Sequence, residues 1–315
     1  MSDKPPGESF SSFTVEPNGN PELVPSEPKQ DVLLLIHNVQ KAYGEKTVLE
    51  DIDLALTEGE LCTVVGPSGC GKSTLLRLIL GQERPSLGEV LIDGASVGFP
   101  DPQRGIVYQQ YSLYPHLSVI ENVVLGPKLS SGLIERFRRK KEFRDEAMYF
   151  LDKMRLTDHY SKYPHELSGG MRQRVAIAQA LIMRPRILLM DEPFGALDPG
   201  TREHLQVFLL EAWEEFDMTV FFVTHDLEEA VFLGTRIIVL SQFYQYDAET
   251  TDRPRKGAMI VADFPLPRRA TSTLVKQSAE FGALIQQIRR DGFDPNYLQH
   301  VTEFDLRHPD SFHTL

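Results

Sequence analysis

The chain has 315 residues, 41% of them hydrophobic, and its 45 acidic and 33 basic side chains give a formal net charge of −12 at pH 7. This length suits one large domain with appendages or two modest ones, and the hydrophobic content is ample for a globular core. The acidic balance disfavours a general nucleic-acid binder. No apolar stretch approaches the ~20 residues of a transmembrane helix, so we expect a chain that is soluble by itself.

The N-terminal segment, residues 1–30, is rich in Pro, Ser, Glu and Gly and lacks the apolar stretch of a secretory signal. We therefore expect a disordered tail in a cytosolic protein. The chain has two cysteines, Cys62 and Cys70. Reduced thiols in a cytosolic core are expected there rather than a disulfide.

Two kinds of strand are predicted along the chain. A small β-layer is expected from three segments bounded by turn-rich sequence, residues 32–39, 49–56 and 89–92. Short, continuous apolar runs are typical of the central strands of a sheet that helices cover on both faces. Such runs occupy residues 61–65, 187–190, 220–223 and 237–240.

The sequence changes character between about residues 111 and 164, where it becomes polar, charged and helix-favouring, notably over residues 134–154. This change predicts a helical subdomain inserted into the core. Beyond residue 242, the segment 243–268 has strand-like pieces punctuated by proline, and residues 272–290 have helical periodicity. No internal repeat is visible.

A glycine-rich loop with the sequence GPSGCGKST spans residues 66–74. Such a loop lacks side chains where backbone N–H groups must converge on phosphate oxygens, and the following helix adds its positive N-terminal end. Lys72 is expected to reach the β- and γ-phosphates, and the Ser73 hydroxyl to ligate Mg²⁺. The predicted strand 61–65 and the helical spacing over residues 73–80 supply the strand–loop–helix frame. The candidate nucleotide-binding residues are Gly66, Pro67, Ser68, Gly69, Cys70, Gly71, Lys72, Ser73 and Thr74.

Two carboxylates, Asp191 and Glu192, follow the apolar run that begins at Ile187. A strand that ends this way delivers both to the carboxyl edge of the sheet, where open α/β folds place nucleotides. Asp191 is suited to hold Mg²⁺, which prefers oxygen ligands and keeps several waters. Glu192 is expected to orient and deprotonate an attacking water.

Residues 167–174 read LSGGMRQR, which resembles the signature sequence of ABC transporter ATP-binding subunits. The resemblance covers about residues 31–242 and leaves 243–315 as a C-terminal extension. It implies an α/β fold: a P-loop NTPase (RecA-like) core with an antiparallel β-layer and an inserted α-helical subdomain at about 111–164. The activity implied is ATP hydrolysis, with ATP and Mg²⁺ as cofactors.

The signature is also an anion nest, since Ser168, Gly169 and Gly170 at a helix N-terminus can donate to a γ-phosphate. In the family this nest faces the phosphate loop of a second subunit, so that two ATP molecules lie between two chains. The resemblance therefore implies that a lone chain is an incomplete ATPase.

Four further positions match the family one by one. Tyr43 resembles the aromatic residue that stacks on adenine. Gln109 resembles the catalytic glutamine that approaches Mg²⁺, although the adjacent Gln110 leaves the register open. Asp198 resembles a residue that communicates across the dimer, and His225 resembles the histidine that contacts the γ-phosphate.

Within the family, residues 191–198 and 114–119 are similar to importer subunits of the nitrate, sulfonate and taurine type. Residues 80–86 and 180–185 are more narrowly similar to subunits that accompany urea-carboxylase systems. The implied partners are a second copy of the chain, integral membrane permease subunits and, indirectly, an extracytoplasmic solute-binding protein, with no nucleic acid. The implied location is the cytoplasmic face of the inner membrane.

Several alternatives stay open. The aromatic and apolar segment 111–117 is expected to form a groove for a short helix of the permease, or else the core of its own loop. The basic run 138–141 is more typical of a solvated helix face than of a lipid contact. The C-terminal extension braces the dimer, contacts the partner or packs on its own core. A soluble ABC ATPase acting on nucleic acid or ribosomes, and an exporter subunit, are the alternative functions.

Overall fold

A computed structural model describes residues 32–242, 257–266, 276 and 278–293. The chain divides into two units, residues 1–31 and 32–315. The first unit, where a disordered tail is predicted, lies outside the described residues.

The first of the two sheets described in the second unit is antiparallel, in the order β2-β1-β4-β5. It consists of β1 (Val32–Tyr43), β2 (Lys46–Thr57), β4 (Leu87–Ile92) and β5 (Ala95–Ser96). Ile36 at its centre is opposite Leu54 on one side and Val90 on the other, and all three are buried. The predicted antiparallel layer is thus confirmed, with β1 and β2 longer than the sequence indicated.

The second sheet is largely parallel, in the order β10-β9-β3-β8-β7-β6. Its parallel strands are β3 (Leu61–Val65), β6 (Arg104–Val107), β7 (Ile187–Asp191), β8 (Thr219–Val223) and β9 (Arg236–Ser241). β3, β7 and β8 are buried along their whole length, as their continuous apolar runs predicted. β10 (Met259–Pro265) pairs antiparallel with β9 at one edge.

The edge strand β6 was not predicted, because its four residues include a charged one, Arg104. That side chain is nevertheless buried, since Nη2 donates to the carbonyl of Phe99 and forms an ion pair with Asp101 at 2.7 Å. Burying a guanidinium is tolerated where its N–H groups find acceptors.

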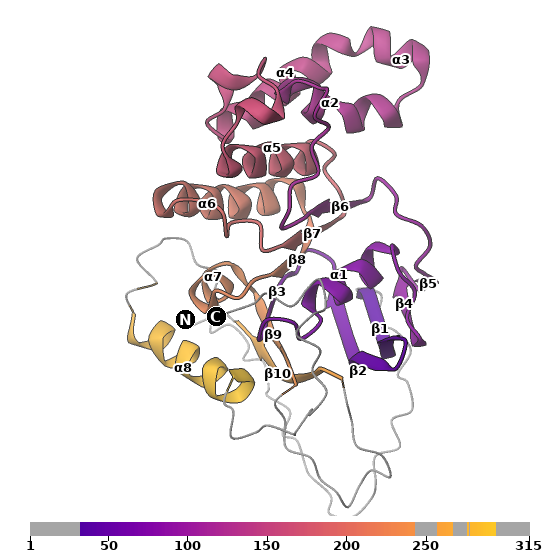
Figure 1. Ribbon diagram of the computed structural model, residues 1–315, viewed down its shortest axis with the longest axis vertical. Helices are drawn as coiled ribbons and strands as arrows, with labels where there is room; N and C mark the ends of the chain where they lie inside the picture. The colour runs from indigo at the N-terminus through magenta and orange to yellow at the C-terminus, as the bar shows by residue number, and fades with distance from the viewer. Residues whose placement is uncertain (1–31, 243–256, 267–275, 277, 294–315) are drawn as a thin grey trace, which may run out of the picture. The chain divides into compact units, whose positions relative to one another are not determined.

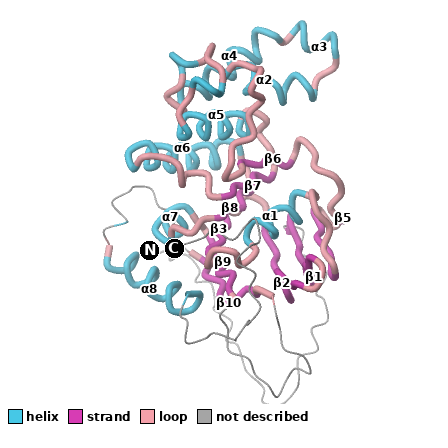
Figure 2. Tube along the Cα trace, in the orientation of Figure 1, coloured by secondary structure: helices cyan, strands magenta, loops and turns pink. Residues whose placement is uncertain are grey.

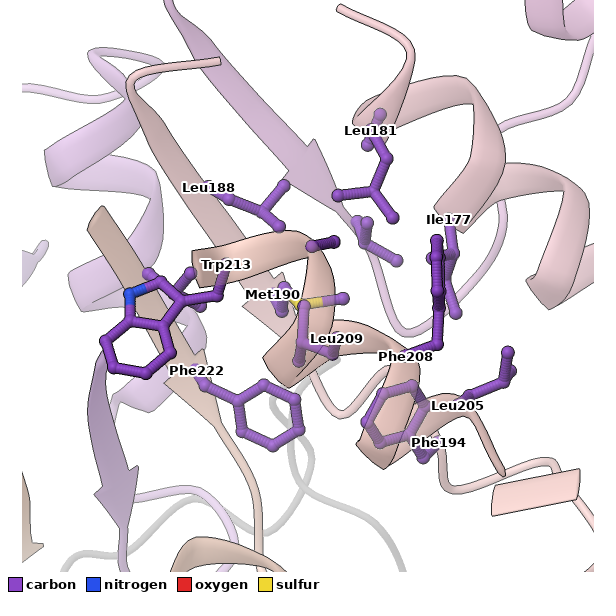
Figure 3. Packing of buried hydrophobic residues seen from close by; sticks show 14 of the residues in the cluster. Ile177, Leu181, Leu188, Met190, Phe194, Leu205, Phe208, Leu209, Trp213 and Phe222 are labelled. Carbon is purple, nitrogen blue, oxygen red and sulfur yellow. The ribbon is translucent and has the colours of Figure 1, made fainter. Parts of the chain in front are cut away.

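Two cores hold the sheets in place. Helix α1 (Lys72–Leu80) belongs to a core with residues from both sheets, so the phosphate loop is anchored from two sides. The other core packs α5 (Gly169–Leu181) and α6 (Pro199–Phe216) against β7 and β8. Figure 3 shows this packing, with Leu188, Met190 and Phe222 from the strands and Ile177, Leu181, Phe208, Leu209 and Trp213 from the helices. The strand that ends in Asp191 is therefore tightly fixed.

A group of helices fills the region of the predicted helical subdomain: α2 (Val119–Ser130), α3 (Leu133–Arg138) and α4 (Lys140–Lys153). Figures 1 and 2 show this group built from helices and loops beside α5. α2 begins with a capping box, in which Ser118 and Glu121 satisfy each other's backbone N–H groups. Arg139 interrupts the long helical stretch between α3 and α4.

The C-terminal helix α8 (Ala279–Phe293) contacts α7 (Leu227–Leu233), β9 and β10. It buries Phe281, Ile285 and Ile288 in the main core. The described part of the extension therefore packs on its own chain, which is one of the alternatives left open above. None of the helices in the described ranges has the length and apolar composition needed to cross a membrane.

Candidate active site

The phosphate loop joins β3 to α1, and two of its glycines are required by its shape. A Cβ on Gly66 would lie 1.9 Å from the backbone oxygen of Leu240. Gly71 caps α1 with φ +96°, a conformation that favours glycine. Lys72 is buried, and its Nζ donates to the carbonyls of Gly66 at 2.8 Å and Pro67 at 3.0 Å. The lysine ammonium is thus held inside the loop.

We expect Gly66→Ala to lower the free energy of unfolding by about 1–3 kcal/mol and to weaken ATP binding. The added methyl group would collide with a main-chain oxygen in β9 that cannot move without disturbing the sheet. Urea unfolding and nucleotide titration measure both effects. Gly98→Ala is the matched control, because a Cβ there has no atom within 4 Å. Equal stability of the two variants would contradict the expectation.

The loop is linked to Tyr43 at the end of β1. The Tyr43 hydroxyl donates to Glu83 at 2.5 Å, and Lys41 Nζ lies 4.9 Å from the ring centroid. Burial, followed by the contact with Glu83, raises the pKa of Tyr43 to about 12. Thr74, the last loop residue, also hydrogen-bonds Tyr43. Tyr43 is therefore held beside the loop, which is compatible with the predicted adenine contact.

Cys62 and Cys70 are both free and buried. Burial raises the pKa of the Cys70 thiol, so the thiol stays protonated and unreactive. Cys70 contributes its backbone to the loop and its side chain to the core.

Asp191, at the end of β7, lies against the phosphate loop. Burial raises the pKa of its carboxyl group, while a hydrogen bond with Ser73 lowers it. β7 and the loop thus bring a carboxylate and a hydroxyl together, as the sequence predicted for a magnesium site.

Glu192 is the centre of the site. Its Oε2 accepts a hydrogen bond from Nε2 of Gln109 at 3.2 Å and lies 3.1 Å from Nδ1 of His225. Side chains from three separate segments of the chain thus come together at one oxygen of Glu192. Of the two adjacent glutamines, the structure brings Gln109 to this oxygen.

The backbone of Glu192 adopts φ +45°, which is uncommon for a residue with a side chain. Its N–H donates to the carbonyl of Val223 at 2.9 Å, which ties the end of β7 to the end of β8. Strained backbone of this kind persists where the surrounding structure enforces it, and often at functional sites.

A buried polar network behind His225 was missed by the sequence analysis. Glu229 on α7 accepts from the Thr224 hydroxyl at 2.6 Å and from Nε2 of Gln206 at 3.0 Å. Thr224 Oγ1 also accepts from the backbone N–H of Asp226 at 3.0 Å, so the network holds the loop that carries His225. Gln206 in turn accepts from Lys276 at 3.1 Å. The part of Glu229 in holding this loop becomes apparent only from the burial of its side chain in the folded chain.

We expect Glu229→Gln to remove a pH-dependent loss of stability. Burial raises the pKa of Glu229 above its ordinary value of 4.5, so its ionised form is destabilising in the folded protein. The unmodified protein should lose stability relative to the variant as pH rises above this value, by about 1.4 kcal/mol for each unit of pKa shift. Denaturant unfolding of both proteins at a series of pH values above 4.5 measures this difference. A difference in stability that does not change with pH would contradict the expectation. Glu228→Gln, at an exposed neighbour, is the control.

The signature residues lie at the N-terminus of α5. Ser168 caps this helix by accepting from the N–H of Met171 at 3.3 Å. A Cβ on Gly169 has no atom within 4 Å, whereas one on Gly170 would lie 3.3 Å from the backbone oxygen of Ala196. The nest is therefore open on the side of Gly169. In the described part of the chain, no hydrogen bond joins residues 168–170 to the phosphate loop. The two anion-binding elements are therefore separate within one chain.

One contact joins the signature helix to the segment that carries Gln109. Nε2 of Gln173 donates to the carbonyl of Tyr108, directly before Gln109, at 3.1 Å.

Asp198 caps α6 by accepting from the N–H of Thr201 at 3.0 Å, and this backbone bond lowers the pKa of its carboxyl group. Asp198 is exposed, as a residue predicted to act across a dimer must be.

Comparison with known proteins identifies the family. The family model described as ABC transporter matches residues 49–195. The aliphatic sulfonates import ATP-binding protein SsuB of Bacillus cereus is 40% identical over 263 residues, which cover 80% of this chain and 97% of that protein. The chain belongs to the ABC transporter family. A second ABC relative, the bicarbonate transport ATP-binding protein CmpD of Synechocystis, is 42% identical over 70% of this chain and 78% of its own length.

Solved ABC cassettes have the same fold. The dimeric structure of a bacterial ABC transporter cassette matches with a TM-score of 0.62 and 34% identity, over 75% of this chain and all of that one. A dimeric post-hydrolysis state bound to ADP and Pi matches with a TM-score of 0.62 and 33% identity, over the same shares. The chain is accordingly an ATP-binding, ATP-hydrolysing ABC protein with the predicted P-loop fold.

The side chains suit Mg²⁺, which favours oxygen donors and keeps several waters rather than a closed protein cage. Ser73 and the buried carboxylate of Asp191 offer two such oxygens at one place. Among the described residues, no group of three or more His, Cys, Asp or Glu side chains is placed to hold a metal ion.

Proposed function

We propose that this chain powers a membrane importer for a small nitrogen- or sulfur-containing solute, as one of two copies that close around two ATP molecules. The observation that carries the proposal is the meeting of Gln109 and His225 at Oε2 of Glu192. A carboxylate with a donor on either side, next to a phosphate loop, is suited to hold and activate a water.

In this mechanism the loop backbone and Lys72 bind the phosphates of ATP, and Tyr43 stacks on its adenine. Glu192 takes a proton from the attacking water, which Gln109 helps to orient, while His225 contacts the γ-phosphate. Ser73, Asp191 and Gln109 would hold Mg²⁺, which would offset phosphate charge when bound.

The second copy supplies the rest of the pocket. Ser168, Gly169 and Gly170 of one chain donate to the γ-phosphate held by the other, and Asp198 acts across the same interface. The open signature nest, unconnected to the loop of its own chain, supports this arrangement. Binding of ATP then favours the closed dimer, because each nucleotide contacts both chains.

The permease contact is proposed for residues 111–117. Tyr114 is exposed, while Asn122 bonds the backbone of Tyr114 in both directions and so fixes this segment. The segment thus presents an aromatic side chain on an ordered backbone, which suits a helix-in-groove contact. Through it the chain is held at the cytoplasmic face of the inner membrane.

The proposed solute class follows the relatives, whose names refer to aliphatic sulfonates and bicarbonate. The narrower resemblance to urea-carboxylase systems remains a prediction. An extracytoplasmic binding protein delivers the solute to the permease, and no residue of this chain touches it.

Co-purification from detergent-solubilised membranes tests the proposal. Recovery of permease subunits, together with solute uptake that depends on an external binding protein, is the expected result. Recovery with ribosomes or nucleic acid and without a permease would replace the proposal with the soluble alternative. Permease-dependent efflux without a binding protein would indicate an exporter.

A further inference from the structure

Helix α3 exposes an unusual number of large apolar side chains. Leu133, Ile134 and Phe137 are 73%, 87% and 83% exposed, and no residue of α3 is buried. In Figure 1, α3 lies at the outer end of the helical group, beyond α2 and α4 as seen from β7. A neighbouring hollow of about 360 Å³ is lined by Glu135 of α3 together with Pro127 and Phe143 from α2 and α4. Packing in the protein core therefore does not account for the apolar character of these three positions.

The charges around this apolar face have one sign. At about 100° per residue, Leu133, Ile134 and Phe137 share one side of the helix, and Arg136 and Arg138 flank it. Glu135 projects from the opposite side, where Arg139 pairs with it at 3.1 Å. Arg139 also pairs with Glu142 at 2.6 Å. Both of these carboxylates are thus engaged by the same arginine.

Two more cationic positions, Lys140 and Lys141 at the start of α4, complete the surface. Arg138, Lys140 and Lys141 are exposed, and within the described ranges no hydrogen bond or ion pair joins them to an acidic side chain. Apolar side chains on one face with cations at its margins are typical of helices that lie in the interface of an anionic membrane.

We propose that α3 and the start of α4 form a membrane-contact ridge, consisting of Leu133, Ile134, Phe137, Arg138, Lys140 and Lys141. The apolar side chains enter the headgroup region of an anionic bilayer, and the cations bind lipid phosphates. The sequence favoured a solvated helix face for the basic run. The exposed apolar face changes that preference, because solvation explains cations but not three adjacent large hydrophobic residues. The ridge requires no particular solute or permease.

Charge complementarity favours an anionic membrane surface as the partner of the ridge. The chain carries a net charge of −12, so its remaining surface is repelled by anionic lipid. At moderate salt, screening limits this repulsion to about 10 Å. Because the ridge lies at the outer end of the helical group, its cations reach the membrane before the acidic surface does. Binding is accordingly expected to depend on lipid charge and to weaken at high salt.

The test uses the full chain and a tryptophan reporter. Phe137→Trp should show a blue-shifted emission with vesicles of phosphatidylglycerol and phosphatidylcholine, and no shift with phosphatidylcholine alone. Phe99→Trp is the matched control, since Phe99 is 86% exposed in the loop between β5 and β6, outside the ridge, and should not respond. Both variants retain Trp213, so the difference between them reports the ridge. A shift of equal size for both, or with neutral vesicles, overturns the proposal.

Charge reversal provides a second measurement. Lys140→Glu with Lys141→Glu should weaken vesicle binding at least about twentyfold, because each cation near an anionic surface contributes about fivefold. ATP binding should not change, since neither residue touches the phosphate loop. Unchanged vesicle binding overturns the proposal. Loss of permease co-purification without any vesicle binding also overturns it, and assigns the ridge to a protein partner.

Discussion

Glu192→Gln should lower the rate of ATP hydrolysis by about a hundredfold to ten-thousandfold, the usual contribution of a general base. The amide has the shape of the carboxylate and retains an oxygen that can accept from Gln109 at the position close to His225. It cannot take a proton from water. ATP binding should therefore persist, and ATP-bound dimers should accumulate because the step that opens them is blocked.

Steady-state hydrolysis, nucleotide titration and size-exclusion chromatography with ATP measure these three effects. Glu228→Gln makes the same chemical change at an exposed position on α7 and should leave all three unchanged. Near-normal hydrolysis by Glu192→Gln would remove Glu192 from the proposed role. Loss of ATP binding would instead give it a structural role in the loop region.

Ser168→Asp should abolish assembly of the ATP-bound dimer while leaving ATP binding to the single chain intact. Aspartate caps a helix as well as serine, so α5 should keep its first turn. It would place a negative charge against the γ-phosphate of the partner's nucleotide. Like charges brought together cost several kcal/mol, which corresponds to more than a hundredfold weaker assembly.

Ser168→Asn is the matched control, because asparagine has the same size and caps equally well without the charge. Both changes are best made in the Glu192→Gln background, where dimers accumulate, and compared by analytical ultracentrifugation with ATP. Equal assembly of the Asp and Asn variants would show that the nest does not face a phosphate. A loss of ATP binding in the single chain would place the nest at the nucleotide of its own chain.

Patterns within short stretches account for what the sequence made predictable. The phosphate loop is recognised from nine consecutive residues, and the continuous apolar runs of β3, β7 and β8 indicate strands that are buried on both faces. Asp191 could be placed at the edge of the sheet because it follows such a run. These features depend on local spacing, which the chain order states directly.

Some local features were nevertheless missed. β6 has four residues and a buried arginine, so no apolar run marks it. Its burial depends on partners near Phe99 and Asp101 that only folding brings into reach. Glu229 likewise has the appearance of an ordinary helical surface residue until Thr224 and Gln206 surround it.

By itself, the sequence determined the family resemblance, the nucleotide chemistry and the residue types of the site. Tertiary structure alone decided that Gln109 and His225 meet at a single oxygen of Glu192 and that α3 exposes its apolar face. It also decided that the described part of the extension packs on the core of its own chain. The reason is physical: periodicity reports which side of a segment is apolar, whereas contacts between distant segments, and the burial of that side, depend on how the sheets and helices pack.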